Sequence, residues 1–343
     1  MNSYFALTEE QQRLLLSQTA ARVGLPEQAV EKDLWVTTVL QVVFTLPYAD
    51  KLLFKGGTTL AKSGLIDRFS EDIDLAIDRS QFGFEGDLTK KQLKTLRKES
   101  SLFVRDVISA DLRQALSNFG MGSLCVVEPE PDGEGDKTYP EPRKIHLRYH
   151  SVFAAPLPYL HPEVMLEIGA RSLFEPYRKV KVDSFLTLNT PVNTAVSKIE
   201  IPMAEPAKTF LEKAFLLHEL FSTGEPRKAD RKSRHLYDLE KMMRHPEIIA
   251  AIGADDLWNS IHHHRSVFTP LREVDYTPDI RDRICLTPPD NSIDDWRNDY
   301  QSMCESMIYE PSPVSFDKLM ERMKELENLF RNRKAELKRY DKA

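Results

Sequence analysis

Residues 52–78 read LLFKGGTTLAKSGLIDRFSEDIDLAID. The short apolar run Lys51–Lys55 ends at a Gly-Gly pair, which predicts a strand followed by a turn. Thr58–Ser63 fits a short helix, and Ile73–Ile77 alternates apolar with polar residues as a half-buried strand does. Strand, Gly-Gly-Thr turn, short helix and second strand form one ordered unit, and this unit decides the fold.

Two carboxylates follow this turn. Side chains two apart on a strand project from the same face, so we expect Asp72 and Asp74 to lie together. Adjacent carboxylates repel each other unless a cation lies between them, and hard divalent cations prefer such ligands while leaving positions for phosphate oxygens. Gly56 and Gly57 allow backbone N–H groups to approach a triphosphate, and Thr58 adds a hydroxyl donor. The combination predicts metal-dependent phosphate chemistry, whereas either motif alone is common in ordinary strand ends and turns.

Composition limits the class of protein. The formal charge of −6 argues against a surface that binds nucleic acid everywhere, but allows a local basic patch. The 3 cysteines are widely spaced and odd in number, which suggests neither a disulfide framework nor a metal site and fits a reducing compartment. The N-terminus does not resemble a secretion signal, and no apolar stretch is long enough to span a bilayer. We therefore expect a cytoplasmic protein that does not partner a membrane.

The periodicities predict an α+β fold, in which a mixed sheet with helices precedes a helical C-terminal half. We expect the domains to be residues 1–205 and 206–343. The expected helices before the boundary are Thr8–Val23, a helix from Pro26 to about Leu46, and Leu88–Asn118, and further strands are Lys144–Tyr149 and Val164–Ile168. The acidic, Pro- and Gly-rich stretch Glu128–Pro142 is expected to be a loop.

Several segments resemble one known family. KGGTTLAK (55–62) and RFSEDIDLAI (68–77) are similar to motifs of the AbiEii/AbiGii toxins, to which the MenT toxins are related. VEKDLWVT (30–37), FLEKAFLLHE (210–219) and RHLYDLEKM (234–242) resemble further parts of that family. The resemblance implies a polymerase-beta-like nucleotidyltransferase core and a toxin of a bacterial toxin–antitoxin or abortive-infection system. It further implies transfer of a nucleotide from an NTP onto RNA, at the acceptor end of tRNA, with Mg²⁺ or Mn²⁺.

The family also implies roles for residues outside the first motif. Lys213 matches a lysine that contacts the nucleotide's phosphates, although a lysine on an apolar helix is most often a snorkelling surface residue. Asp238 matches an active-site aspartate that positions the lysine or the nucleotide. Glu167 matches a third carboxylate, a metal ligand or the base for the attacking hydroxyl. It is equally a strand residue paired with Arg148 or Arg171.

Two residues of the second motif and a basic run complete the expected site. Arg68 either neutralises a phosphate or braces the loop, and a phosphate added to Ser70, as relatives suggest, should block nucleotide binding. The expected nucleotide-binding set is Lys55, Gly56, Gly57, Thr58, Arg68, Ser70 and Lys213. The basic run is either a solvated loop or a contact for RNA phosphates, and comprises Arg227, Lys228, Arg231, Lys232 and Arg234.

Two alternatives stay open from the sequence. The same chemistry suits a protein hydroxyl or a small molecule as acceptor. The second alternative is a toxin that binds NTP or RNA without catalysis, although a protein that only binds gains little from paired carboxylates. The resemblance also implies a cognate antitoxin, which is a winged-helix regulator, a kinase or a direct binding partner.

Overall fold

The structure, a computed structural model, describes residues 4–153, 160–192, 199–223 and 229–333, and it separates into two compact units. Unit 1 consists of Met1–Lys62 and Phe69–Ala204, and unit 2 of Ser63–Arg68 and Glu205–Ala343. Sequence reasoning placed a single boundary after residue 205 and did not foresee that Ser63–Arg68 joins the C-terminal unit. The chain therefore passes from one unit to the other at three points.

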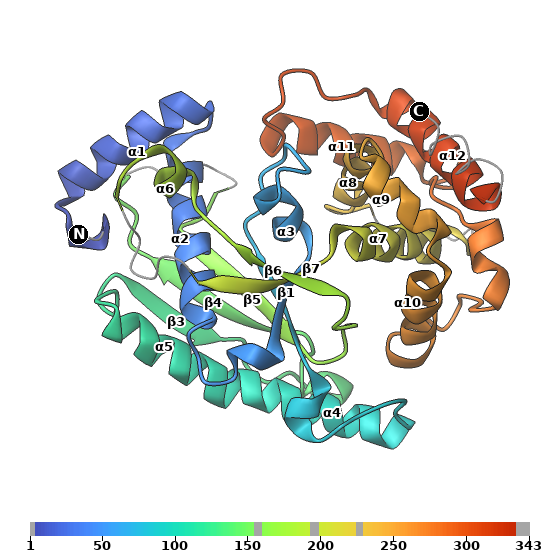
Figure 1. The fold of residues 1–343 in the computed structure, drawn as a ribbon, viewed down its shortest axis with the longest axis horizontal. Helices are drawn as coiled ribbons and strands as arrows, with labels where there is room; N and C mark the ends of the chain where they lie inside the picture. Colours follow the sequence, from blue (N-terminus) through green and yellow to red (C-terminus); the bar gives the residue numbers. More distant parts are fainter. Residues whose placement is uncertain (1–3, 154–159, 193–198, 224–228, 334–343) are drawn as a thin grey trace. The chain divides into compact units, whose positions relative to one another are not determined.

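Unit 1 is built on one mixed sheet. Among the described residues seven strands pair in the order β3-β4-β5-β2-β1-β7-β6 (Figure 1). The β1–β7 and β2–β5 pairs are parallel and the others antiparallel, which agrees with the α+β expectation. The strands are β1 Leu52–Lys55, β2 Ile73–Ile77, β3 Cys125–Pro129, β4 Arg143–Tyr149, β5 Glu163–Gly169, β6 Tyr177–Lys181 and β7 Glu200–Ala204.

The two faces of the sheet differ in polarity. On β2, Ile73, Leu75 and Ile77 are buried on one face, while Asp74 projects from the other. Helix α2, Glu27–Val43, covers the apolar face, where its Trp35 ring stacks on Tyr149 of β4 at a centroid distance of 4.9 Å. The opposite face is thereby left to carry the polar side chains of the central strands.

The helices of unit 1 follow their local signals. Thr8 caps α1 through a capping box, and Gly24 ends the helix in the left-handed conformation. The expected long helix 88–118 is present as α4 and α5, joined by the π-helical turn Phe103–Ile108. The bounds are α1 Glu9–Val23, α3 Gly57–Lys62, α4 Lys90–Leu102, α5 Ser109–Asn118 and α6 Phe185–Asn189.

Unit 2 is helical in its described residues, as expected. Its first helix, α7, is apolar on most sides, and the Phe210 ring stacks on Phe330 of the last helix with centroids 6.3 Å apart. The helices are α7 Pro206–Phe221, α8 Ser233–Met242, α9 Pro246–Ile249, α10 Asp255–Phe268, α11 Ile293–Ser306 and α12 Phe316–Arg331. None of the described helices has the length and apolarity needed to cross a membrane.

Ser63–Arg68 is fixed to unit 2 by contacts of its backbone and side chains. Tyr309 donates its backbone N–H to Asp67 O at 3.0 Å, and Arg68 forms an isolated β-bridge with Ile308. Lys241 Nζ lies 2.5 Å from Asp67 Oδ2. The segment between the Gly-Gly-Thr turn and the Asp-x-Asp strand is therefore part of the C-terminal unit.

The expected loop Glu128–Pro142 is wrong at its start, because β3 continues to Pro129. β3 is an edge strand, where a proline has no second neighbour that needs its missing N–H. β3, β6, β7 and α6 were not expected at all. The sequence of β6, YRKVK, lies on the other edge with most residues exposed, so it lacks the apolar alternation that marks a strand.

Candidate active site

The central strands place four charged residues in one row on the polar face of the sheet. Lys55 on β1 is opposite Asp74 on β2, and Asp74 is opposite Glu167 on β5. Glu167 is in turn opposite Lys144 on β4. Residues opposite one another on neighbouring strands share a face, so two adjacent carboxylates lie between two lysines.

Gly56 brings the backbone of the turn against Asp74. Its φ of +86° is a conformation that L side chains rarely adopt, and a Cβ built on it would lie 2.0 Å from Asp74 Oδ2. Gly57 then opens the short helix α3. The glycine at position 56 therefore serves the approach of the Asp74 carboxylate as well as the turn itself.

Asp72 precedes the first residue of β2, so its position depends on contacts other than the ladder. The buried Thr58 hydroxyl donates to Asp72 O at 2.5 Å, and Ser70 Oγ lies 2.9 Å from Thr58 Oγ1. Because the single Thr58 hydroxyl hydrogen is directed at Asp72, Ser70 is the donor in the second contact. In this conformation Thr58 braces the Asp72 backbone, a role that sequence reasoning, which expected a phosphate donor, did not foresee.

Glu167 has a lysine as its ion-pair partner. Lys144 Nζ lies 3.3 Å from Glu167 Oε1, and both side chains are half-buried. The two arginines considered from sequence are engaged elsewhere: Arg148 contacts Glu163, and Arg171 contacts Glu141. The strand pairing that brings Lys144 to Glu167 follows from the sheet register, which spacing in the sequence does not reveal.

The carboxylates fit a metal ion that shares its ligands with a substrate. Among the described residues no group of three or more His, Cys, Asp or Glu side chains is gathered to hold a metal ion. Mg²⁺ is commonly bound through one or two carboxylates, with substrate phosphates and waters completing its octahedron. Asp72 and Asp74 satisfy that requirement in number and type, whereas Glu167 does not form a three-carboxylate cluster with them.

Unit 2 contains a second buried polar cluster, centred on Asp238 of α8. Arg68 grips both carboxylate oxygens, with Nε 2.7 Å from Oδ1 and Nη2 2.9 Å from Oδ2. Lys213 of α7 places Nζ 2.9 Å from Oδ2. Asp238 is 0% and Lys213 8% exposed, so Lys213 is held in the interior and does not snorkel at the surface. The Arg68 guanidinium is thus bound to Asp238 in this geometry.

Burial and neighbouring charges shift the pKa values of this cluster. Burial by itself raises the pKa of Asp238, but Arg68 and Lys213 outweigh it and hold that pKa below its usual range. Burial lowers the pKa of Lys213, against the opposing effect of Asp238. Burial and then the Lys213 charge lower the pKa of His235 well below its usual value. Neutral His235 therefore accepts from Lys213 Nζ through Nδ1, at 3.3 Å.

The described part of the basic run lies at the start of α8. Arg231 is exposed with φ 57°, and the Asp299 carboxylate accepts its backbone N–H at 2.6 Å and that of Ser233 at 2.9 Å. Lys232 and Arg234 are half-buried. The other two members of the run, Arg227 and Lys228, lie outside the described residues.

The expected site residues thus fall into two groups, one in each unit. Unit 1 gathers Lys55, Gly56, Gly57, Thr58, Ser70, Asp72, Asp74 and Glu167, and unit 2 gathers Arg68, Lys213 and Asp238. Sequence reasoning missed Lys144 and His235. Lys144 alternates with apolar residues on an expected strand, and His235 lies three residues before Asp238 on the expected helix, so helical and strand periodicity marked both positions without indicating a role.

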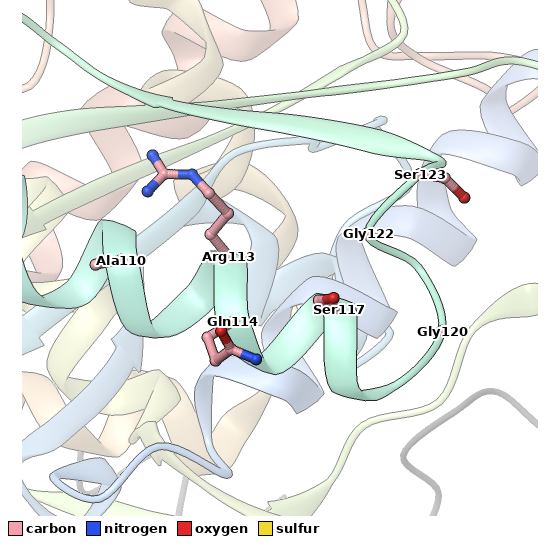
Figure 2. Close-up of a pocket in the computed structure, with 7 residues that line it drawn as sticks. All are labelled: Ala110, Arg113, Gln114, Ser117, Gly120, Gly122 and Ser123. Atoms are coloured by element: carbon pink, nitrogen blue, oxygen red, sulfur yellow. The ribbon is translucent and has the colours of Figure 1, made fainter.

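An open hollow elsewhere in unit 1 carries none of these residues. It lies where α5 turns toward β3 and is lined by Ala110, Arg113, Gln114, Ser117, Gly120, Gly122 and Ser123 (Figure 2). Arg113 extends toward β3, where Nη2 donates to Val127 O at 2.8 Å. Its lining has no carboxylate, so it does not offer the chemistry of the Asp72–Asp74 site.

One carboxylate just before a central strand and one on it, with a glycine turn packed against the second, are typical of a nucleotidyltransferase site, and sequence comparison gives the same class. A family model described as "Nucleotidyl transferase AbiEii toxin, Type IV TA system" matches residues 39–322, which is most of the chain. The chain belongs to this AbiEii family of nucleotidyltransferase toxins. Membership implies an NTP substrate, a divalent metal ion and a cognate antitoxin.

Solved structures include similar chains. MenT4, a nucleotidyltransferase toxin from Mycobacterium tuberculosis H37Rv, is 15% identical with a TM-score of 0.48, over 97% of this chain and 93% of that one. JHP933 from Helicobacter pylori is 14% identical with a TM-score of 0.45, over 92% of this chain and 96% of that one. No match is found among the curated proteins.

Proposed function

We propose that this toxin transfers a nucleotide from an NTP onto RNA, at the acceptor end of tRNA, with Mg²⁺ held by Asp72 and Asp74. The observation that carries the proposal is the fixed pair of carboxylates, with Gly56 against Asp74 and Thr58 donating to the Asp72 backbone. When bound, the metal ion stabilises the charge that develops on the α-phosphate and the leaving pyrophosphate. Mn²⁺, with similar ligand preferences, is expected to substitute.

The protein's own groups orient the reactants. The triphosphate oxygens are held by backbone N–H groups of the Gly56-Gly57-Thr58 turn and by the Lys55 ammonium. These groups lie next to the carboxylates, since Lys55 is opposite Asp74 in the sheet. Lys213, which pairs with Asp238 and lies against His235, matches the lysine for which the family implies a contact with the nucleotide's phosphates. Glu167, adjacent to Asp74, accepts the proton of the attacking hydroxyl.

An RNA acceptor is supported by the basic run that leads into α8. Arg231, Lys232 and Arg234 stand within seven residues of Asp238 in the sequence, so phosphates that they bind enter near the residue expected to act in catalysis. The net charge of −6 makes such a local run the part of the chain suited to a polyanion. Phosphorylation of Ser70 would remove its donated hydrogen bond to Thr58 and add negative charge beside Asp72.

The test is transfer of each labelled NTP, in the presence of Mg²⁺, to total cellular RNA, with the products sized. Label in the tRNA size range supports the proposal. Label on protein or on a small molecule would show that the acceptor is not RNA. The matched pair of variants is Asp72→Asn and Asp78→Asn, because Asp78 directly follows the same strand and its carboxylate accepts the backbone N–H of Ser80 in the next turn. Transfer should vanish in the first and persist in the second, and wild-type transfer by Asp72→Asn would overturn the metal assignment.

A further inference from the structure

Helix α2 contains a run of three consecutive charged residues that are all buried. Glu31, Lys32 and Asp33 are 2%, 5% and 7% exposed, between the buried apolar residues Val30 and Leu34. Acidic residues and lysines are almost never buried unless they are paired. The burial of these three charges therefore requires specific partners inside unit 1.

Lys32 is paired with the residue that precedes Asp72. Its Nζ lies 2.5 Å from Glu71 Oε2. The Glu71 side chain therefore points toward α2. The ladder of β2 begins only at Ile73. Lys32 therefore holds, through Glu71, the backbone that leads into the first ladder residue of β2.

Asp33 holds the end of the preceding element. Its Oδ1 lies 2.5 Å from Nζ of Lys62, the last residue of α3, and its Oδ2 accepts the backbone N–H of Phe185 at 2.8 Å. Lys62 Nζ also donates to Thr37 Oγ1, one turn further along α2, at 2.7 Å. Helix α3 carries Thr58, whose hydroxyl braces Asp72. Asp33 thus fixes the helix from which that brace extends.

The two ion pairs lie on either side of the point where the chain leaves unit 1. Lys62 is the last residue before the Ser63–Arg68 segment, and Glu71 comes two residues after the chain returns at Phe69. We infer that Lys32 and Asp33 are positioning residues of the nucleotidyl-transfer site, which hold α3 and the Asp72 backbone in register so that Asp72 and Asp74 present one metal-binding pair. This inference rests on the proposed metal role of Asp72 and Asp74.

Glu31 supplies a matched control within the same run. It is equally buried, but its carboxylate accepts from Ser151 Oγ at 2.6 Å and from Val152 N at 2.8 Å, in the segment after β4. Replacing Glu31 removes buried hydrogen bonds of the same helix without touching α3 or the Asp72 backbone. A purely structural role for the run predicts that all three positions respond alike.

The experiment compares full-length Lys32→Met, Asp33→Asn, Glu71→Gln and Glu31→Gln with the wild type. Mn²⁺ binding is followed by electron paramagnetic resonance with each NTP in turn, and transfer to RNA is measured at a temperature at which every variant is folded. We expect the first three to lose at least about tenfold in Mn²⁺ affinity or in kcat. Glu31→Gln should stay within about twofold of the wild type, although its Tm also falls.

A charge exchange provides the rescue. The double variant Lys32→Glu with Glu71→Lys should recover Mn²⁺ binding relative to Lys32→Met, because the bridge is rebuilt in reverse. Glu71→Gln preserves shape at a partly exposed site, so it decides the question if Lys32→Met does not fold. Wild-type Mn²⁺ affinity and kcat in Lys32→Met, Asp33→Asn and Glu71→Gln would overturn the inference, as would an equal loss in Glu31→Gln.

Asp72→Asn separates this inference from the function on which it rests. If Asp72→Asn binds Mn²⁺ as the wild type does, the metal assignment fails, and the transfer rates still decide whether Lys32 and Asp33 position the site. If only Asp72→Asn loses Mn²⁺ while the α2 variants bind and react normally, the metal assignment stands and the positioning inference fails. Absence of RNA labelling by the wild type counts against the acceptor alone.

Discussion

The Asp74 carboxylate occupies the space that a side chain at position 56 would need. A Cβ on Gly56 would lie 2.0 Å from Asp74 Oδ2 and 2.8 Å from its Cγ. Gly56 and Asp74, eighteen residues apart in sequence, are therefore in direct contact, so the turn and β2 must fit each other closely. Changes at the turn should act on the chemistry through Asp74.

Gly56→Ala should abolish most nucleotidyl transfer. The new methyl group must displace the Asp74 carboxylate, and a displacement of about 1 Å at a reacting group costs about 100-fold in rate. The control is Gly83→Ala, because Gly83 has a similar φ of +72° but no atom within 4 Å of its Cβ position. Both variants should lose about 1 kcal/mol of stability from backbone strain. Equal transfer rates in the two variants would show that the contact with Asp74 has no catalytic consequence.

Glu167→Gln should reduce kcat by about 100-fold or more if the carboxylate acts as the base. Glu163 is the matched position, since it lies on the same face of β5 and is also ion-paired, to His146 and Arg148. Glu163→Gln should leave kcat within about twofold. The measurement is single-turnover transfer as a function of pH. Retention of wild-type kcat by Glu167→Gln reduces the role of Glu167 to its ion pair with Lys144.

Asp238→Asn should destabilise unit 2 strongly. Loss of the carboxylate charge leaves Arg68 and Lys213 buried beside an amide, and breaking a buried pair in this way costs about 3–5 kcal/mol. Urea unfolding measures the difference. The exposed pair Arg148–Glu128 provides the comparison, and Glu128→Gln should leave the free energy of unfolding nearly unchanged.

The same carboxylate makes part of the stability depend on acid. Its folded pKa is lowered, so the stabilisation is complete above the ordinary carboxyl range and declines as the pH falls through about 4 toward the folded value. Asp238→Asn, already without this charge, should lose less stability than the wild type between pH 5 and pH 3. An identical loss in both proteins would contradict the assigned direction of the shift.

His218 should make unit 2 less stable in mild acid. Burial, followed by the Arg283 charge, lowers the pKa of His218 to about 4, and its Nδ1 accepts the backbone N–H of Cys285 at 3.2 Å. In the unfolded chain His218 takes up a proton near pH 6.5, whereas in the folded protein it stays neutral there, so stability is lost as the pH falls. Between pH 7 and pH 5 the loss is about 2 kcal/mol.

His218→Asn should flatten that pH dependence, because an amide oxygen can accept the Cys285 N–H without titrating. Urea unfolding at pH 7 and pH 5 gives the comparison. His161→Asn, at an exposed histidine of unit 1, should retain the wild-type dependence. A wild-type pH dependence in His218→Asn would show that His218 is not the group responsible.

Local patterns were enough to predict the core of the candidate site. Asp72, Asp74 and the Gly56-Gly57-Thr58 turn lie within one short stretch, where alternation and turn chemistry fix the elements. The helices of unit 2 could also be predicted, because their apolar positions recur at helical spacing. Resemblance to a family added Lys213 and Asp238, which the structure joins by an ion pair of 2.9 Å.

What could not be predicted depends on long-range pairing. Arg68 meets Asp238 across 170 positions of sequence, and Lys144 meets Glu167 through the register of two strands. The burial of the Glu31-Lys32-Asp33 run depends on partners from four other segments, at residues 62, 71, 151–152 and 185. Edge strand β6 was not predicted because its mostly exposed residues lack the apolar alternation that marks a strand.

Because Ser63–Arg68 belongs to unit 2, that unit is encoded by two separate stretches of the gene. A chimera that exchanges everything after residue 204 with a relative would retain Asp67 and Arg68 from one parent and receive the positions of Lys241 and Asp238 from the other. A C-terminal half taken from a relative without its own equivalent of Ser63–Arg68 must therefore pair with the Ser63–Arg68 segment of this chain. Modular redesign of this toxin has to move two discontinuous pieces of coding sequence together.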